Sequence, residues 1–135
     1  NEMVKIHQYV IMCAPTVSQY AGLEALTNYR REDELAIMRD AYDERRRVMV
    51  DGFRAMGLDC FEPQGAFYVF PSIQTTGLSS GEFCERLLYE NHTAVVPGTA
   101  FGDSGEGFIR CSYAYSIKSI QIALERIEEF LKTLK

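Results

Sequence analysis

The chain has 135 residues, a common size for a single domain, and its 47% hydrophobic and 24% charged residues are typical of a folded globular protein. Fourteen lysine and arginine residues against nineteen aspartate and glutamate residues give a net charge of −5. This argues against a general nucleic-acid-binding protein, because such proteins need a basic surface. The longest apolar run, residues 9–14, is too short to cross a membrane, and the N-terminus has no signal-peptide pattern. We therefore expect a cytoplasmic protein with neither a nucleic-acid nor a membrane partner.

The four cysteines are spaced too widely for a zinc site or a dense disulfide scaffold. None belongs to a C-x-x-C pair, and the chain has only two histidines. We expect no metal site and four buried thiols in a reducing compartment. They are Cys13, Cys60, Cys84 and Cys111.

Two helices are predicted in the first part of the chain. The first runs over residues 16–27, where Thr16 and Gln19 match a capping box. The apolar stretch before it, residues 9–13, is either extended or helical. The second helix covers residues 33–56, where apolar residues recur near a 3.6-residue period and Gly57 provides a left-handed stop. Its length of roughly 36 Å is typical of a helix between two domains, although a long surface helix has the same pattern.

Short strands alternate with helices in the rest of the chain. Residues 59–62 and 66–70 are predicted to form a hairpin or a tightly linked strand pair around the turn 63–65. A capping box from Ser79 to Glu82 predicts a helix to about residue 90. We expect that helix to bury Phe83, Cys84, Leu87 and Leu88.

The C-terminal part is predicted to hold two strands and one helix. The strands are residues 93–96 and 108–113, with a flexible loop rich in glycine and acid at 102–107. Ser116 caps a final helix that reaches residue 134 and carries one apolar face. The pattern indicates an α+β fold, with a small mixed sheet of three to four strands covered by helices.

Arg110 is the most distinctive polar residue of the predicted sheet. Alternation places Ile109 and Cys111 on one face of their strand and Arg110 on the other. A guanidinium within an apolar strand needs a partner or water, because its desolvation is unfavourable. Arg110 therefore has two interpretations: a structural ion pair or solvated face, or a planar group that binds a substrate carboxylate through two parallel hydrogen bonds.

Several blocks of the sequence resemble class I (fold type I) pyridoxal-phosphate (PLP)-dependent aminotransferases, and the aspartate and aromatic branch most closely. The resemblance covers nearly the whole chain, and its blocks keep the family's order. They are residues 5–9 and 14–21, YDERR at 42–46, PQGAFY at 63–68, VVPGTAFG at 95–102 and FIRCSYA at 108–114.

This resemblance implies a domain organisation and a set of site residues. Residues 1–32 would be the helical end of the large cofactor domain, and residues 33–135 the small C-terminal domain with its long linking helix. Arg110 would hold the substrate α-carboxylate. The border of the active site would be formed by Gly65, Phe67, Tyr68, Pro97 and Gly98.

The resemblance also implies that the catalytic lysine is missing. The family's S-x-[ST]-K block, whose lysine forms the Schiff base, has no counterpart among Lys5, Lys118, Lys132 and Lys135. The sequence opens on Asn1 rather than methionine, so we expect the C-terminal fragment of a longer enzyme, inactive alone, without bound PLP and without a catalytic residue of its own. The full-length enzyme would be a PLP-containing homodimer that acts on an amino acid and a 2-oxo acid, with aspartate, alanine and aromatic substrates all open. A stand-alone α+β module that binds an amino or oxo acid is the alternative.

Overall fold

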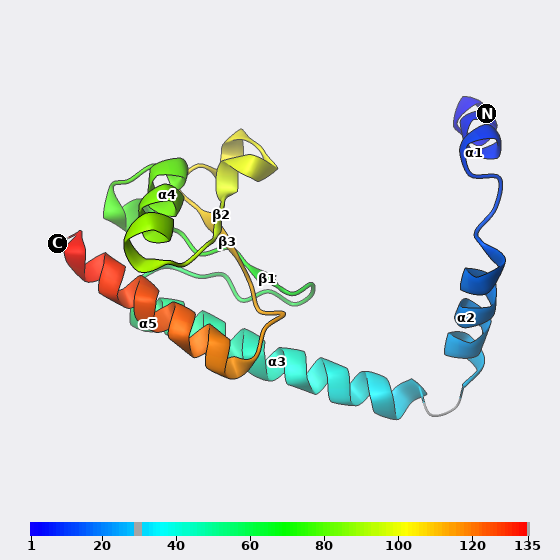
Figure 1. Cartoon of the computed structure of the whole chain (residues 1–135), viewed down its shortest axis with the longest axis horizontal. Coiled ribbons are helices and arrows are strands. Elements are labelled where there is room, and N and C mark those ends of the chain that lie inside the picture. The colour runs from blue at the N-terminus through cyan, green and yellow to red at the C-terminus, as the bar shows by residue number, and fades with distance from the viewer. Residues whose placement is uncertain (29–30, 135) are drawn as a thin grey trace. The chain divides into compact units, whose positions relative to one another are not determined.

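The structure, a computed structural model, describes residues 1–28 and 31–134. It forms two compact units, Asn1–Met38 and Arg39–Lys135 (Figure 1). Helix α3, Arg31–Ala55, contributes to both units.

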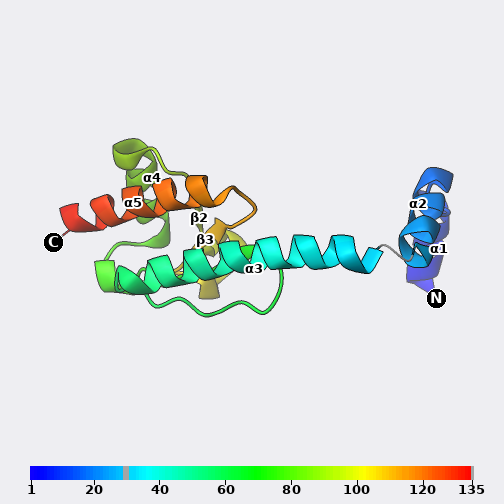
Figure 2. The same cartoon turned by 90° about the horizontal axis from the view of Figure 1, so that it is seen from below.

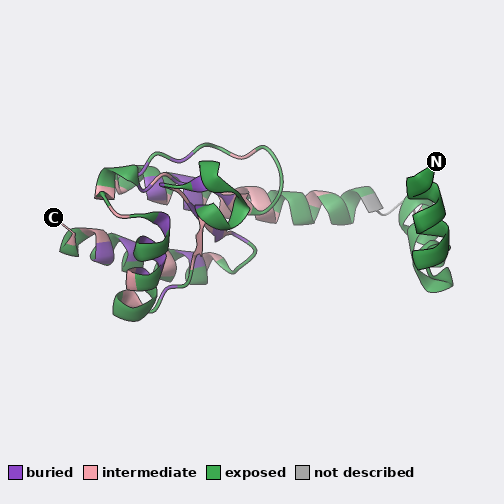
Figure 3. Ribbon diagram, turned by 90° about the horizontal axis from the view of Figure 1, so that it is seen from above, coloured by how far each residue is buried: buried purple, intermediate pink, exposed green. Residues whose placement is uncertain are grey.

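The first unit contains α1, Glu2–Val10, and α2, Thr16–Thr27, and neither helix buries a residue (Figure 3). The predicted helix over 16–27 is confirmed, and residues 9 and 10 of the undecided stretch are helical. The predicted capping box is wrong: the residue before the helix is Pro15, and Thr16 is already helical. The Gln19 amide nitrogen instead donates to the carbonyl oxygen of Ala14 at 2.7 Å. A proline fixed in an extended conformation ahead of the helix leaves Thr16 no capping position.

Helix α3 confirms the long predicted helix, and it ends at the expected glycine. Gly57 has a φ of +84°, and the amide of Leu58 donates to the carbonyl of Phe53 at 3.1 Å, as in a glycine-terminated helix. The C-terminal half of α3 buries Met49, Val50 and Phe53. This half attaches the helix to the core of the second unit.

The sheet of the second unit has three short antiparallel strands. They are β1, Tyr68–Val69, β2, Val96–Pro97, and β3, Ile109–Ser112, in the order β1-β3-β2. The register places Tyr68 opposite Ser112 and Val96 opposite Arg110. The expected α+β fold is confirmed, and β3 is the central strand, but in the described residues the sheet is antiparallel and not mixed, because β3 runs opposite to both of its neighbours.

The predicted hairpin at 59–70 is wrong, because its first limb is not a strand. One backbone hydrogen bond joins the two limbs, from the amide of Ser72 to the carbonyl of Asp59 at 2.8 Å, and β1 pairs with β3 instead. Pro63 has no N–H for a strand ladder, and Ala66 has a left-handed φ of +61°. The chain therefore crosses from α3 to the sheet as an irregular loop.

Helices α4, Ser80–Asn91, and α5, Ile117–Thr133, complete the core. Both predicted caps are confirmed: the Ser79 side chain accepts from the amide of Glu82, and the Ser116 side chain from the amide of Ser119. Helices α3 and α5 run in roughly the same direction in both views (Figures 1 and 2). They pack closely, since a Cβ at Gly52 would lie 2.6 Å from the side chain of Leu124.

The core confirms the apolar faces predicted for α4 and α5, with one exception. Leu88 was expected to be buried but is 44% exposed, because it lies at the edge of the stripe formed by Phe83 and Leu87. One buried cluster joins β1 and β3 to α3, α4 and α5, so the helices pack on the sheet face that carries Ile109 and Cys111. The opposite face of the sheet, with Arg110, is half-buried.

The glycine-rich segment predicted as a flexible loop is partly regular. Gly98–Phe101 (η2) and Asp103–Gly105 (η3) are 3₁₀ turns, and they touch closely through Gly98 and Gly105. The predicted strand over 93–96 is reduced to β2, which ends one residue later at Pro97.

The cysteines differ in exposure, which corrects one expectation. Cys60, Cys84 and Cys111 are buried, whereas Cys13 is exposed, because the first unit has no core to cover it. Burial raises the pKa of Cys60 and of Cys84 to about 11, and it also raises that of Cys111.

Cys13 is therefore expected to be the only rapidly reactive thiol of the described residues. The thiolate is the reactive form, and a pKa of about 11 instead of 9.0 lowers its population at pH 8 about a hundredfold. In a DTNB titration at pH 8 one thiol should react quickly in the native chain, and four in urea. Cys13→Ser should abolish the fast phase, and a second thiol that reacts as fast as Cys13 would contradict the expectation.

Candidate functional site

The candidate site lies on the half-buried face of the sheet, around Arg110 of β3. Alternation along the strand buries Ile109 and Cys111 against the helices and turns Arg110 and Ser112 to the other side. The guanidinium carbon of Arg110 lies 4.4 Å from the ring centroid of Tyr68 on β1 and 4.5 Å from that of Phe101 on η2. Arg110 also lines a cavity of about 580 Å³, but that cavity opens mainly toward helices α3 and α5, and neither Tyr68 nor Phe101 lines it.

Arg110 is held by aromatic rings and not by an acidic side chain. Within the described residues it forms neither an ion pair nor a side-chain hydrogen bond, unlike Arg46 and Arg86, which pair with carboxylates. Contacts of a cation with ring faces contribute about 0.5–2 kcal/mol each. Neither contact uses an N–H group in a hydrogen bond, so the N–H groups of the guanidinium remain able to donate. The arrangement can therefore bind a planar anion such as a carboxylate.

A cluster of phenylalanines extends the aromatic surface next to Arg110. The ring of Phe70 lies 6.1 Å from that of Phe101, edge to face, and stacks on that of Phe108 at 5.6 Å. Alternation in the sequence places Phe108 on the face of Arg110, but none of the three was predicted as a site residue. Two were detectable, because Phe70 is two residues from Tyr68 and Phe108 two residues from Arg110, which places each pair on one face of a strand. Phe101 approaches through tertiary folding, and no local pattern indicates it.

Some of the residues expected to border the active site lie on the Arg110 face of the sheet, and the others lie next to it. Tyr68 contacts Arg110 directly, and the ring of Phe67, which is 41% exposed, lies 4.3 Å from that of Tyr68. Pro97 pairs with Ile109, and Gly98 is buried at the start of η2. These two residues place the turn that carries Phe101.

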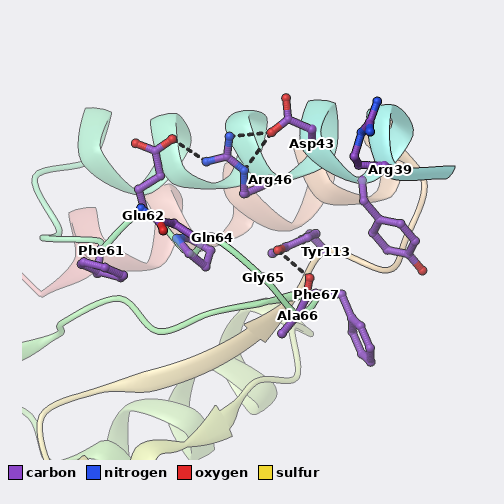
Figure 4. A pocket seen from close by; sticks show the side chains of 12 residues that line it. Arg39, Asp43, Arg46, Phe61, Glu62, Gln64, Gly65, Ala66, Phe67 and Tyr113 are labelled. Atoms are coloured by element: carbon purple, nitrogen blue, oxygen red, sulfur yellow. Dashed lines mark hydrogen bonds and ion pairs between the residues drawn. The ribbon is translucent and has the colours of Figure 1, made fainter. Parts of the chain in front are cut away.

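Gly65 lies apart from Arg110, in the wall of a second cavity of about 770 Å³ between α3 and the loop 61–67 (Figure 4). Arg110 does not line this cavity, whereas Phe67 does. The structure therefore does not bring Gly65 together with Arg110, and Phe67 is the residue that borders both regions.

Two contacts fix the loop 61–67 against the rest of the unit (Figure 4). Arg46 binds Asp43 and Glu62, and these hydrogen bonds lower the pKa of both carboxyls and raise that of Arg46. The hydroxyl of Tyr113 donates to the carbonyl of Ala66 at 2.9 Å, and burial raises its pKa. The loop thus enters β1 in a fixed orientation, with Phe67 next to Tyr68.

The lysines of the described residues do not lie at either cavity. Lys5 pairs with Glu2 in α1, Lys132 pairs with Glu128 in α5, and Lys118 is exposed on the first turn of α5. None lines either of these two cavities, so the residues around them do not fit a cofactor that must be held by a lysine.

Comparison with known proteins shows the family of the chain. The family model for aminotransferases of class I and II matches residues 1–127. The chain belongs to this family. Within the described residues no helix is long and apolar enough to cross a membrane.

Individual members of the family are similar to this chain in sequence and in structure. YugH of Bacillus subtilis is 51% identical over 131 residues, which are 97% of this chain and 33% of YugH. The aspartate aminotransferase of Pyrococcus abyssi is 43% identical over 135 residues, 100% of this chain and 35% of that enzyme. The crystal structure of an aromatic aminotransferase from Pyrococcus horikoshii superposes with a TM-score of 0.92 at 44% identity and covers 98% of this chain and 36% of that one. This aminotransferase chain therefore spans about a third of the proteins it matches.

Proposed function

We propose that the chain is the C-terminal part of a PLP-dependent aminotransferase that transfers an amino group from an amino acid to a 2-oxo acid, and that Arg110 binds the substrate α-carboxylate. The observation that carries the role of Arg110 is its environment. The guanidinium is half-buried in contact with two aromatic rings, on the sheet face away from the helices, and no acidic residue of the described chain pairs with it.

A carboxylate matches the geometry that the guanidinium offers. Its two oxygens accept two parallel N–H···O bonds from one edge of the guanidinium. Stacking against rings fixes the plane of the fork before the substrate arrives, so less freedom is lost on binding. In this proposal Arg110 orients the amino acid by one end, which places its Cα for reaction.

The cofactor belongs to the remainder of the proposed enzyme. When bound, PLP supplies the electron sink of the reaction. The described lysines do not line the cavities here, so the proposal assigns the Schiff-base lysine to the part of the protein outside this chain. The chain alone is then expected to be inactive and to bind no PLP.

The same proposal includes a homodimer of the full-length enzyme and a cytoplasmic location. Helices α1 and α2 bury no residue, and apolar side chains such as Tyr9 and Val17 are 90% and 81% exposed, so other parts of the assembly are needed to cover them. All four cysteines are free thiols, which is typical of a reducing compartment.

The function is tested by amino transfer in the full-length protein that contains this chain. Aspartate, alanine and tyrosine serve as donors and 2-oxoglutarate as acceptor, and the new amino acid is quantified by mass spectrometry. PLP-dependent transfer from at least one donor is expected. Absence of transfer by a folded, PLP-loaded protein with every donor would refute the proposal.

The isolated chain is expected to form no specific covalent adduct with PLP. The chain is mixed with PLP, reduced with borohydride and mapped by mass spectrometry, with the full-length protein as the positive control. Substoichiometric labelling spread over several lysines is expected, because exposed lysines such as Lys118 react non-selectively. A single stoichiometric adduct at one lysine would contradict the assignment of the cofactor site to the rest of the enzyme.

A further inference from the structure

We propose that Phe101 is a positioning residue for Arg110, holding the guanidinium plane in the orientation that accepts a carboxylate. The proposal rests on the carboxylate-binding function proposed above for Arg110. Arginine has a long, flexible side chain, and one ring contact leaves its head group free to turn away. Phe101, at 4.5 Å, adds a second ring contact to that of Tyr68 at 4.4 Å, and this restricts the head group further.

The exposure of Phe101 indicates that it does not serve to fill the core. Its ring is 52% exposed, whereas the core phenylalanines Phe53, Phe83 and Phe130 are fully buried. Its ring contacts in the described residues are with Arg110 and with Phe70, which in turn stacks on Phe108. Phe101 thus contacts both the cation and a neighbouring ring that is itself part of a stacked pair.

The backbone that carries Phe101 is fixed independently of the aromatic cluster. The buried hydroxyl of Ser80 accepts from the amides of Gly107 and Phe108 at 2.8 and 3.2 Å. The carboxylate of Glu106 accepts from the amide of Ser80 at 2.8 Å. The amide of Gly98 donates to the carbonyl of Phe108 at 2.8 Å, so both ends of the segment 98–108 are attached. A rigid support of this kind is what a positioning residue needs.

Loss of the ring should affect binding more than turnover. Without Phe101 the guanidinium keeps its charge and its contact with Tyr68 but visits more orientations, so fewer molecules are ready for a carboxylate. A cation–ring contact of this type corresponds to about a 2- to 30-fold change in an equilibrium constant. A merely structural role would lower the fraction of active enzyme, and hence kcat, and leave KM unchanged.

The test compares Phe101→Leu, Phe101→Tyr and Tyr89→Leu in the full-length protein. Tyr89 is an exposed aromatic of α4, 73% accessible, and is the matched control. For amino acid substrates Phe101→Leu should raise KM about 2- to 30-fold with kcat little changed. Phe101→Tyr, which keeps the ring, should restore KM, and Tyr89→Leu should leave it unaltered. For an amine without the carboxylate, all variants should have the wild-type KM.

A second measurement separates this inference from the proposed function. With ¹⁵Nε-arginine labelling, the Hε signal of Arg110 is assigned by its loss in Arg110→Lys. Ring currents should displace it in the wild type and in Phe101→Tyr, and Phe101→Leu should move it toward the position of an unstacked arginine. An unmoved signal would overturn the positioning role and leave the carboxylate role of Arg110 standing. A moved signal with an unchanged KM would also overturn the positioning role, because the orientation set by Phe101 would then not matter for binding, and the carboxylate role would still be decided by Arg110→Lys.

Discussion

Replacing Arg110 with lysine in the full-length protein is expected to lower kcat/KM for amino acid substrates by about 2–4 kcal/mol, on the order of 30- to 1,000-fold. Lysine keeps the positive charge but loses the planar fork that donates two parallel hydrogen bonds to a carboxylate. It also replaces a flat group in contact with the rings of Tyr68 and Phe101 with a compact ammonium. Steady-state kinetics with wild type and variant measures the loss.

Two controls make this result specific for the carboxylate. For an amine that lacks the α-carboxylate, the loss should largely vanish. Arg86→Lys is the matched arginine control, because Arg86 also lies over a ring, that of Phe130 at 5.4 Å, and pairs with Glu90 on α4. Its activity should stay near wild type. Equal losses for both types of substrate would return Arg110 to a structural role.

Gly98→Ala is expected to destabilise the second unit by about 3 kcal/mol or more. An alanine Cβ at this position would lie 2.0 Å from the carbonyl oxygen of Gly105 and 2.8 Å from that of Phe108. Both obstacles are backbone atoms, which cannot move aside as a flexible side chain does. The contact of η2 with η3 would have to open, and the hydrogen bond from the Gly98 amide to Phe108 would be disturbed.

Urea unfolding followed by far-UV circular dichroism measures this effect, at a concentration where light scattering shows no association. Gly81→Ala is the control, because a Cβ at Gly81 meets nothing within 4 Å and the residue lies in α4. Alanine there should be neutral or stabilising by up to about 1 kcal/mol. If Gly98→Ala kept the wild-type midpoint, the close approach of the two turns would not contribute to stability.

Much of the fold was predictable because its signals are local. Gly57 ended α3, and Ser79 and Ser116 began α4 and α5, because caps depend on residues within one turn. The faces of β3 followed from alternation alone, including the side taken by Arg110. The capping box at Thr16 failed although the signal is local, because the preceding Pro15 occupies the capping position.

The parts that could not be predicted depend on distant residues. No local pattern near residues 59–62 indicates that Glu62 binds Arg46 of α3. The segment makes this contact where the sequence predicted a hairpin. The turns at 98–105 depend on the hydroxyl of Ser80, which lies 25 to 28 residues from its partners. At the candidate site Arg110 and Tyr68 were indicated by the sequence. Phe101 contacts Arg110 only because the turn that carries it is held by the distant Ser80.

The uncharged surroundings of Arg110 have a consequence for competition at the site. An acidic residue tethered in the same chain would act as a permanent rival to the incoming substrate, at an effective concentration of about a millimolar or more. The substrate carboxylate would first have to displace that acidic side chain from the arginine. Because Phe101 cannot accept a hydrogen bond from the edge of the guanidinium, it fixes Arg110 without opposing the ligand. The aromatic contacts thus restrict the orientation of the guanidinium without using its N–H groups. An incoming carboxylate can bind these groups without first displacing an acidic side chain.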